Sequence, residues 1–452
     1  GYGSLTANTT ASNNVAIGES TMLSADNGSS EKNIAIGRLA LTGGSGALIG
    51  NIAIGHKALD ATATYAHTGT IAIGMDALTA LTSGSGNTAV GYQSMDSATT
   101  SAANVCVGYQ TGSSITTGNG SNTAMGYQSL ATCNTGTYNT TLGFRAGMNA
   151  TTMYGSTIVG SGALGSGTAT AYYNNIFGMN AGSNITGGGY NQIMGFEAGY
   201  VMTTTTNTVL IGHQVGKAIN STDANGTIGI GHQALTALTS GAGNVAIGYN
   251  AMLEHQTGGS NTVIGHNAMN DSNNHAGEHN VFVGTTSGAG GWSGAASSNT
   301  AIGSFSFGGG AKTAAAVNNV AVGRDSLYAL TSGHSNVALG KSAGVSITTM
   351  SETTLVGFNA GSSLSTGTGQ NVAIGSEALS TATSVQFTTA VGYKALQGIS
   401  AAAADDNQTT GIGWAAGYNI TTGLRNTAIG AQALLDNQTG NNNTAVGQLA
   451  LE

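Results

Sequence analysis

A five-residue phrase recurs along the whole chain of 452 residues, and it constrains the fold more than any other feature. The phrase reads NVAIG at 14–18, NIAIG at 33–37 and NTAVG at 443–447. The glycine that closes each phrase serves here as an anchor, and 26 such anchors follow one another at spacings of 17 to 21 residues, most often 17. A fixed period of this length, with turn residues in every unit, indicates a solenoid. Extra residues can bulge from a loop, whereas a shorter coil could not close.

Composition decides between helical and β coils. The chain holds 74 glycines and no proline, and its phrases are rich in β-branched residues. Glycine, asparagine and threonine all lower helix propensity, whereas strands of about five residues joined by Gly and Asn turns fit the pattern. We therefore predict an all-β fold, a parallel β-solenoid of about 26 stacked coils of 17–21 residues, as a single continuous array over residues 1–452.

Positions within the phrase have distinct roles. The residue before the anchor is nearly always Ile or Val, and the residue two before it is usually Ala. Because alternate residues of a strand point to opposite faces, we expect the bulky residue to face the core and the Ala to face something that approaches closely, such as another chain.

Asn stands four residues before the anchor in 18 of the 25 complete phrases, and Ser or Thr stands there in the other seven. This exchange indicates a side chain that bonds local backbone at a turn and stacks in a ladder along the fibre. The alternative is that Asn merely tolerates the backbone angles of the turn. The predicted core and turn residues are Asn14, Ile17, Gly18, Asn51, Ile54, Gly55, Asn87, Val90, Gly91, Asn244, Ile247, Gly248, Asn371, Ile374 and Gly375.

A compensation links two further positions. Four residues after the anchor, 17 units carry a bulky apolar residue and nine carry Gly. In seven of those nine an apolar residue appears seven after the anchor instead, so we infer that one core slot is filled by either route. The units that begin at Gly143 and Gly284 break the rule, and Trp292 is the candidate to fill the slot in the second.

The phrases resemble repeats of two families of fibrous proteins. NVAIG and NTAVG, followed by small and polar residues, resemble the head repeats of trimeric autotransporter adhesins. NTAVGYQSM at 87–95, NTAMGYQSL at 122–130 and NVAIGYNAM at 244–252 resemble the repeats of phage-type tail fibre proteins. The resemblance covers essentially the whole chain, and it implies a homotrimeric parallel β-roll that displays a receptor-binding surface or positions a distal tip. The chain departs from the adhesins in its longer coil and in lacking a recognisable coiled-coil stalk.

Charge and apolar runs exclude several functions. Ten Lys and Arg against 18 Asp and Glu give a net charge of −8, which argues against nucleic acid, since its affinity comes largely from basic groups on phosphates. No stretch approaches the roughly 20 apolar residues that span a membrane. Cys106 and Cys133 differ in repeat position, and we expect both to be unpaired. The chain begins at Gly1 without Met, which suggests a portion of something longer.

The residue after the anchor is aromatic or His in 14 of 26 units, which predicts a column of rings along the surface or an interface. Such rings could bind sugars or simply stack on one another and across chains. The candidate column is Tyr92, Tyr109, Tyr127, Phe144, Tyr249, Phe358, Tyr393 and Trp414.

Catalytic and metal sites find little support in the sequence. NNHAGEHN at 273–280 brings His275, Glu278 and His279 together, but no helix fixes their spacing, so a solvated loop is the expected reading over a metal site. Serine-rich runs lack a nucleophile elbow. We predict no enzymatic activity, no metal and no cofactor.

Three functions are compatible with these features. The first is an extracellular, cell-surface or virion fibre shaft, a homotrimer that presents an attachment surface to a glycan or receptor. The second is a subunit of a filament that stacks end to end, because solenoid ends are open unless capped. The third is an ice-binding solenoid, prompted by TTTTNT at 203–208 and disfavoured because no Thr-x-Thr pair keeps a fixed place in every coil.

Overall fold

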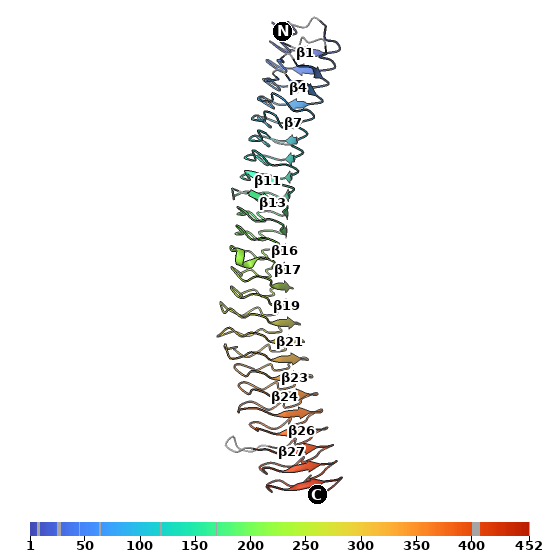
Figure 1. Cartoon of the computed structure of the whole chain (residues 1–452), viewed down its shortest axis with the longest axis vertical. Coiled ribbons are helices and arrows are strands. Elements are labelled where there is room, and N and C mark those ends of the chain that lie inside the picture. Colours follow the sequence, from blue (N-terminus) through green and yellow to red (C-terminus); the bar gives the residue numbers. More distant parts are fainter. Residues whose placement is uncertain are drawn as a thin grey trace. The chain divides into compact units, whose positions relative to one another are not determined.

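A computed structural model describes residues 1–6, 10–24, 29–44, 46–62, 65–117, 120–168, 170–399 and 407–451. These residues form an all-β parallel solenoid of about 24 turns with almost no helix, which confirms the predicted all-β parallel solenoid, with slightly fewer turns than the 26 coils expected. The chain divides into two compact units, Gly1–Asn225 and Gly226–Glu452. In both, the coils are stacked with their main strands in a row (Figure 1).

In the first unit each coil gives one strand of three residues to a parallel sheet, and each strand pairs with its equivalent one coil away. These strands are β1 (Val15–Ile17), β2 (Ile34–Ile36), β4 (Ile52–Ile54), β6 (Ile71–Ile73), β7 (Thr88–Val90), β8 (Val105–Val107), β9 (Thr123–Met125), β10 (Thr140–Leu142), β12 (Thr157–Val159), β14 (Asn175–Phe177), β15 (Gln192–Met194) and β16 (Val209–Ile211). Two small sheets and a 3-10 turn lie elsewhere in the described coils of this unit. These elements are β3 (Leu48–Ile49) with β5 (His67–Thr68), β11 (Thr152–Tyr154) with β13 (Thr170–Tyr172), and η1 (Thr222–Ala224).

The second unit repeats this arrangement. Its strands are β17 (Ile228–Ile230), β18 (Val245–Ile247), β19 (Thr262–Ile264), β20 (Val281–Val283), β21 (Thr300–Ile302), β22 (Val320–Val322), β23 (Val337–Leu339), β24 (Thr354–Val356), β25 (Val372–Ile374), β26 (Thr389–Val391), β27 (Thr410–Ile412), β28 (Thr427–Ile429) and β29 (Thr444–Val446). The strands are shorter than the expected five residues because positive φ angles break the extended backbone on both sides. Around β18 these angles are +67° at Gly243 and +140° at Gly248.

The two faces of the main strands are the reverse of those predicted. Ala246, two before the anchor, is fully buried, whereas Ile247, one before it, is partly exposed. None of the 25 residues that precede an anchor at the end of a described strand is buried, and twelve of them expose 36–68% of their surface. The predicted core residues Ile17, Ile54, Val90, Ile247 and Ile374 therefore lie on the outer face of the sheet. The inward position two before the anchor is buried whether it holds Ala, as at Ala246, or a larger residue, as at Ile158 and Phe282, so its place on the strand and not its size decides which side chain faces the core.

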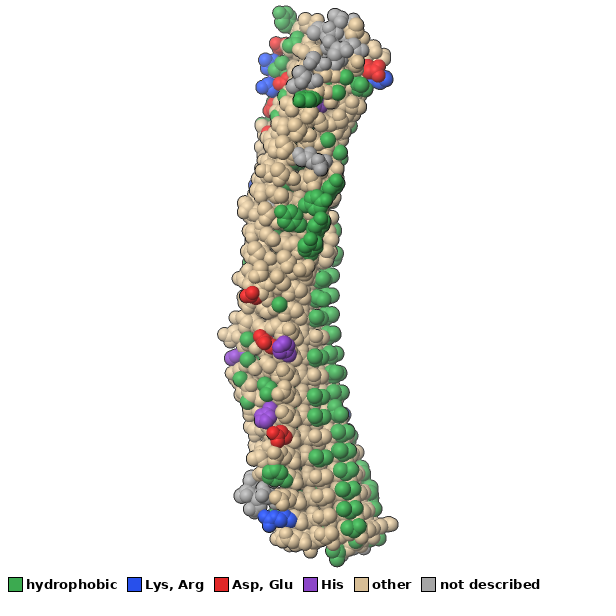
Figure 2. Space-filling view, viewed as in Figure 1, with side chains coloured by type: hydrophobic (Ala, Val, Ile, Leu, Met, Phe, Trp, Pro, Cys, Tyr) green, Lys and Arg blue, Asp and Glu red, His purple; other side chains and the backbone are tan. Residues whose placement is uncertain are grey.

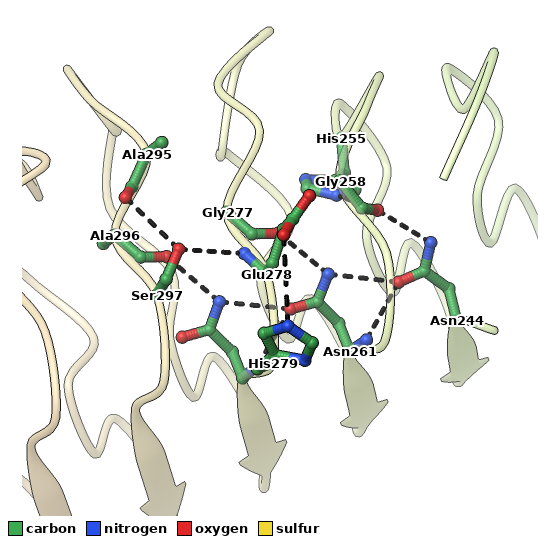
Figure 3. Close-up of polar contacts among 11 residues, drawn as sticks. Asn244, His255, Gly258, Asn261, Gly277, Glu278, His279, Ala295, Ala296 and Ser297 are labelled. Carbon is green, nitrogen blue, oxygen red and sulfur yellow. Dashed lines mark hydrogen bonds and ion pairs between the residues drawn. The ribbon is translucent and has the colours of Figure 1, made fainter. Parts of the chain in front are cut away.

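The Asn four before the anchor forms the predicted ladder. The Oδ1 atom of Asn244 accepts hydrogen bonds from both the backbone N–H and the Nδ2 of Asn261, and Asn261 Oδ1 does the same for Asn280, at 3.0–3.1 Å (Figure 3). Each Nδ2 also donates to a carbonyl of the next coil, as Asn261 does to Gly277 at 2.9 Å. The left-handed residue of the turn precedes the Asn, for example Gly243 at φ +67°. The Asn is thus present for its hydrogen bonds and not for its backbone angles.

The anchor glycines let neighbouring coils approach closely. A Cβ atom built on Gly55 would lie 2.4 Å from the carbonyl oxygen of Gly74, the next anchor, and one built on Gly248 would lie 2.4 Å from that of Gly265. Real Cβ atoms do not make contacts this short, and φ near +139° is strained for any other residue. Only glycine therefore permits this stacking.

The inferred core slot exists. The residue four after the anchor has the same left-handed backbone in both kinds of coil, with φ of 54° at Leu59 and 60° at Gly112. A Cβ on Gly361 would lie 2.7 Å from Leu364 Cδ1, because the residue seven after the anchor occupies the space that a side chain at Gly361 would need. The seven alternative residues are all 0–2% exposed, and they are Ile115, Ile185, Met202, Ile219, Ile347, Leu364 and Ile420.

The two exceptional coils fill the slot differently. A Cβ on Gly288 would meet the ring of Phe282 at 2.4 Å, so Phe282 fills this slot and not Trp292 as expected. Trp292 is buried and packs edge-on against Phe282, with ring centroids 6.2 Å apart. Beside Gly147 the space is bordered by Thr141 and by Met153 of β11, at 3.3 and 3.7 Å from the built Cβ.

Candidate functional site

The outward residues before the anchors form a row of apolar side chains in each unit, and we call these residues the outer stripe. In the second unit Figure 2 shows columns of hydrophobic side chains running over the main strands. Ile264 exposes 36%, Ile412 39% and Val446 68% of their surface. The members in the first unit are Ile17, Ile36, Ile54, Ile73, Val90, Val107, Met125, Leu142, Val159, Phe177, Met194 and Ile211. The members in the second unit are Ile230, Ile247, Ile264, Val283, Ile302, Val322, Leu339, Val356, Ile374, Val391, Ile412, Ile429 and Val446.

Four of the predicted column residues form one continuous stack in the first unit. The rings of Tyr92, Tyr109, Tyr127 and Phe144 follow one another at centroid distances of 5.3, 5.0 and 5.3 Å with planes within 15° of parallel. Offset stacks of this spacing are favourable beyond the burial of their area. The stack itself therefore gives these rings a structural role.

An amide ladder runs beside that stack. Gln110 Nε2 donates to Gln93 Oε1 at 2.9 Å, Gln128 Nε2 donates to Gln110 Oε1 at 3.0 Å, and Arg145 Nε donates to Gln128 Oε1 at 3.2 Å. Since these amides already bond one another, binding a sugar here would break existing hydrogen bonds.

The other four column residues lie in the second unit and are not brought into one stack. Tyr249 lies between His232 and His266, with ring centroids 4.9 and 5.1 Å away. The ammonium of Lys341 lies 5.6 Å from the centre of the Phe358 ring. Tyr393 and Trp414 border a cleft. All eight predicted rings are exposed by 40–51%.

A second group of tyrosines was not anticipated from the sequence. Tyr138, Tyr154, Tyr173 and Tyr190 follow one another at 5.3–5.5 Å and expose 37–58% of their surface. They come from the linkers, and Tyr138, Tyr173 and Tyr190 each lie five residues before an anchor. Tyr138, Tyr173 and Tyr190 each have a left-handed backbone and directly precede a ladder Asn. Their shared position before that Asn is the sequence signal that could have predicted this group.

The titratable groups with the largest pKa displacements are buried in the core. Burial lowers the pKa of Lys312 to about 7, and its Nζ donates to the Ala289 carbonyl at 3.4 Å and lies 4.8 Å from the centre of the Phe307 ring. Burial lowers the pKa of His255 to about 4, although its contact with the Gly258 carbonyl acts in the opposite direction. Burial raises the pKa of the Cys106 thiol to about 12, and Cys106 and Cys133 are both free. None of these groups lines an open site.

The His-rich loop does not gather metal ligands. Glu278 and His279 are 52% and 64% exposed, and His279 Nε2 lies 4.0 Å from Glu278 Oε2 (Figure 3). Across the described ranges, no three His, Cys, Asp or Glu side chains are arranged to hold a metal ion. The acidic pair Asp405 and Asp406 lies outside the described residues.

No protein-family model matches the chain, and no curated protein matches it. Among the described residues, no helix is long and apolar enough to cross a membrane.

Proposed function

We propose that the chain is a non-enzymatic structural protein, a subunit of a homotrimeric fibre that forms a rigid shaft and presents an attachment surface. The single observation that carries this proposal is the outer stripe. Soluble monomers rarely expose contiguous apolar patches larger than a few hundred Å², and the stripe repeats a partly exposed apolar residue on each of 25 described strands.

Further copies of this chain are the partner that fits the stripe. The partner must be as regular as the stripe and must offer one apolar group for every rung of parallel strands. An identical chain in register meets both requirements, and closed rotational symmetry lets the same patch serve on every subunit. The resemblance of the NxAIG phrase to trimeric adhesin heads and tail fibre repeats favours three copies over two.

Composition and burial support a structural role on a cell surface or virion. Only 6% of residues are charged, and the fold depends on repeated Asn, Ser and Thr hydrogen bonds that hold neighbouring coils together. The strongly displaced titratable groups, Lys312 and His255, are enclosed in the coil interior, where a substrate has no access. A cell-surface glycan or receptor is the proposed binding partner of the fibre.

Electron micrographs of the purified chain test this proposal. We expect discrete rods of uniform length, whereas filaments of indefinite length would favour end-to-end polymerisation instead. Ile247→Glu places a charge in the outer stripe and should disperse the rods into thinner particles. Asn274→Glu adds the same charge to an exposed linker and should leave them intact. Rods that survive Ile247→Glu unchanged would refute assembly through the stripe.

A further inference from the structure

A cleft opens on the surface of the second unit where three successive coils meet. It has a volume of about 420 Å³. The coil after Gly392 contributes Tyr393 and Lys394, the coil after Gly413 contributes Trp414, Tyr418 and Asn419, and the coil after Gly430 contributes Gln432. Because neighbouring coils are held by the sheet and the ladders, these side chains project from a fixed scaffold.

The rings in this cleft depart from the stacking seen elsewhere at the same repeat position. Tyr92 and Tyr109 face each other at 5.3 Å, but Tyr393 and Trp414, which hold the equivalent places in neighbouring coils, make no ring contact within the described part of the chain. Trp414 exposes 51% of its surface, whereas the other tryptophan, Trp292, exposes 2%. About half of the surface of Trp414 is thus open to solvent at the edge of a cleft.

Polar groups line the same cleft. The ammonium of Lys394 lies 5.3 and 6.0 Å from the ring centres of Tyr393 and Tyr418, and 3.5 Å from a carboxylate oxygen of Glu377. Asn419 donates to Asp436 at 2.7 Å. The side-chain amide of Gln432 makes no hydrogen bond to any described residue, so both its donor and its acceptor are available.

The charges around the cleft select against anions. Lys394 is balanced by Glu377, and Asp436 adds a further negative charge beside Asn419. An anionic ligand would meet a net negative surrounding, whereas an uncharged ligand would not be repelled. A suitable ligand is therefore neutral, has one apolar face for the indole and carries several hydroxyl groups for the amide and the ammonium.

We propose that this cleft binds a neutral pyranose sugar. The C–H face of the sugar stacks on Trp414, Gln432 exchanges hydrogen bonds with its hydroxyls, and Lys394 donates to a further oxygen. This assignment rests on the proposed function, since it names the ligand class of the attachment surface. Tyr393 and Trp414 of the predicted ring column would then take part in ligand binding, whereas the stacked rings would not.

Ligand-observed NMR on the full chain tests the assignment. The probes are the methyl glycosides of glucose, galactose, mannose and N-acetylglucosamine, with sialic acid and galactose 6-sulfate as acidic counterparts. We expect saturation transfer to at least one neutral glycoside, and at least a tenfold loss of affinity in Trp414→Ala and in Gln432→Ala. Phe358→Ala removes a ring at the same repeat position with a similar lysine contact, and it should bind as the parent chain does.

Acrylamide quenching gives an independent readout on the unmodified chain. Because Trp292 is buried, the quencher reaches Trp414, and a bound sugar should protect that emission. Binding only of the acidic probes, binding that survives both cleft variants, or no binding of any probe would each overturn the assignment. A particle of trimeric mass that binds none of the sugars would refute sugar binding in the cleft but not the trimeric fibre. A monomer would refute the trimeric fibre whether or not it binds a sugar.

Discussion

Asn244 Oδ1 accepts two hydrogen bonds from Asn261, one from its backbone N–H and one from its Nδ2, each 3.0 Å long. Asn261 passes the same pair on to Asn280 and donates to the Gly277 carbonyl at 2.9 Å. One buried side chain thus joins three coils. A buried polar atom that loses its hydrogen-bond partner costs about 1–3 kcal/mol of stability. We therefore expect replacement of a ladder Asn to destabilise the fold more than replacement of an exposed polar residue.

We expect Asn261→Ala to destabilise its coils by about 3 kcal/mol, because it leaves the Gly277 carbonyl and the Asn280 N–H without their partners. Hydrogen exchange across residues 244–299 should report the loss locally, since long repeat arrays open in parts. Asn274→Ala, at an exposed linker residue, should stay within about 0.5 kcal/mol. Equal exchange in the two variants would show that the ladder does not hold the coils together.

Two glycines of one coil should respond differently to alanine. At Gly248 the new Cβ would lie 2.4 Å from the Gly265 carbonyl oxygen, whereas at Gly243 it would meet nothing within 4 Å. We expect Gly248→Ala to cost about 3 kcal/mol or more and Gly243→Ala only about 1 kcal/mol of backbone strain. Thermal unfolding followed by circular dichroism compares the two. Similar losses would mean that coil spacing does not depend on the anchor.

The shared core slot predicts a rescue. Met202→Ala should cost about 2–4 kcal/mol through the cavity that it leaves. A Cβ at Gly199 would lie 2.5 Å from Met202 Sδ and 3.2 Å from the next atom, Leu210 Cδ1, so Gly199→Leu alone should overpack the coil. Together the two changes convert the coil to the commoner pattern, and we expect the double variant to recover more than half of the loss. A double variant no better than the worse single one would contradict the slot.

Lys312 makes stability depend on pH. Its folded pKa is about 7 against an ordinary 10.5, so between these values the unfolded chain binds the extra proton and the folded chain does not. The free energy of unfolding should therefore rise with pH by about 1.4 kcal/mol per unit from about pH 7 to 10.5 and level off below pH 7.

Replacing Lys312 by Met should remove that slope, because the thioether side chain carries no proton to exchange. Lys341→Met, on the exposed surface, should leave it in place. Denaturant midpoints measured between pH 6 and 10.5 decide the matter. A slope that persists in Lys312→Met would assign it to other groups.

Much of the fold could be predicted from the sequence because the repeat samples each position about 25 times. The anchor glycines, the Asn ladder and the shared core slot all follow from which residues exchange for one another. The core slot is filled by a residue four after the anchor, such as Leu379, or by one seven after it, such as Leu364. Such exchanges report local demands on space and hydrogen bonding, and each of these demands is met within a coil or between neighbours.

The faces of the main strand could not be predicted in the same way. Alternation shows that Ala246 and Ile247 point to opposite sides, but not which side is inside. The usual preference for burying the larger side chain fails in this coil, where Met252, four after the anchor, is the large side chain that is buried. The open cleft beside Trp414 could not be predicted either, because the arrangement of the rings depends on side-chain rotamers and the repeat pattern does not specify these.

The native mass of the purified chain, measured by light scattering before and after mild detergent, tests the central claim most directly. The outer stripe predicts a detergent-resistant particle of three times the 44.3 kDa chain mass. Ile247→Glu should lower that mass, and Asn274→Glu should not. A stable 44.3 kDa monomer, with the stripe open to water, would contradict the account.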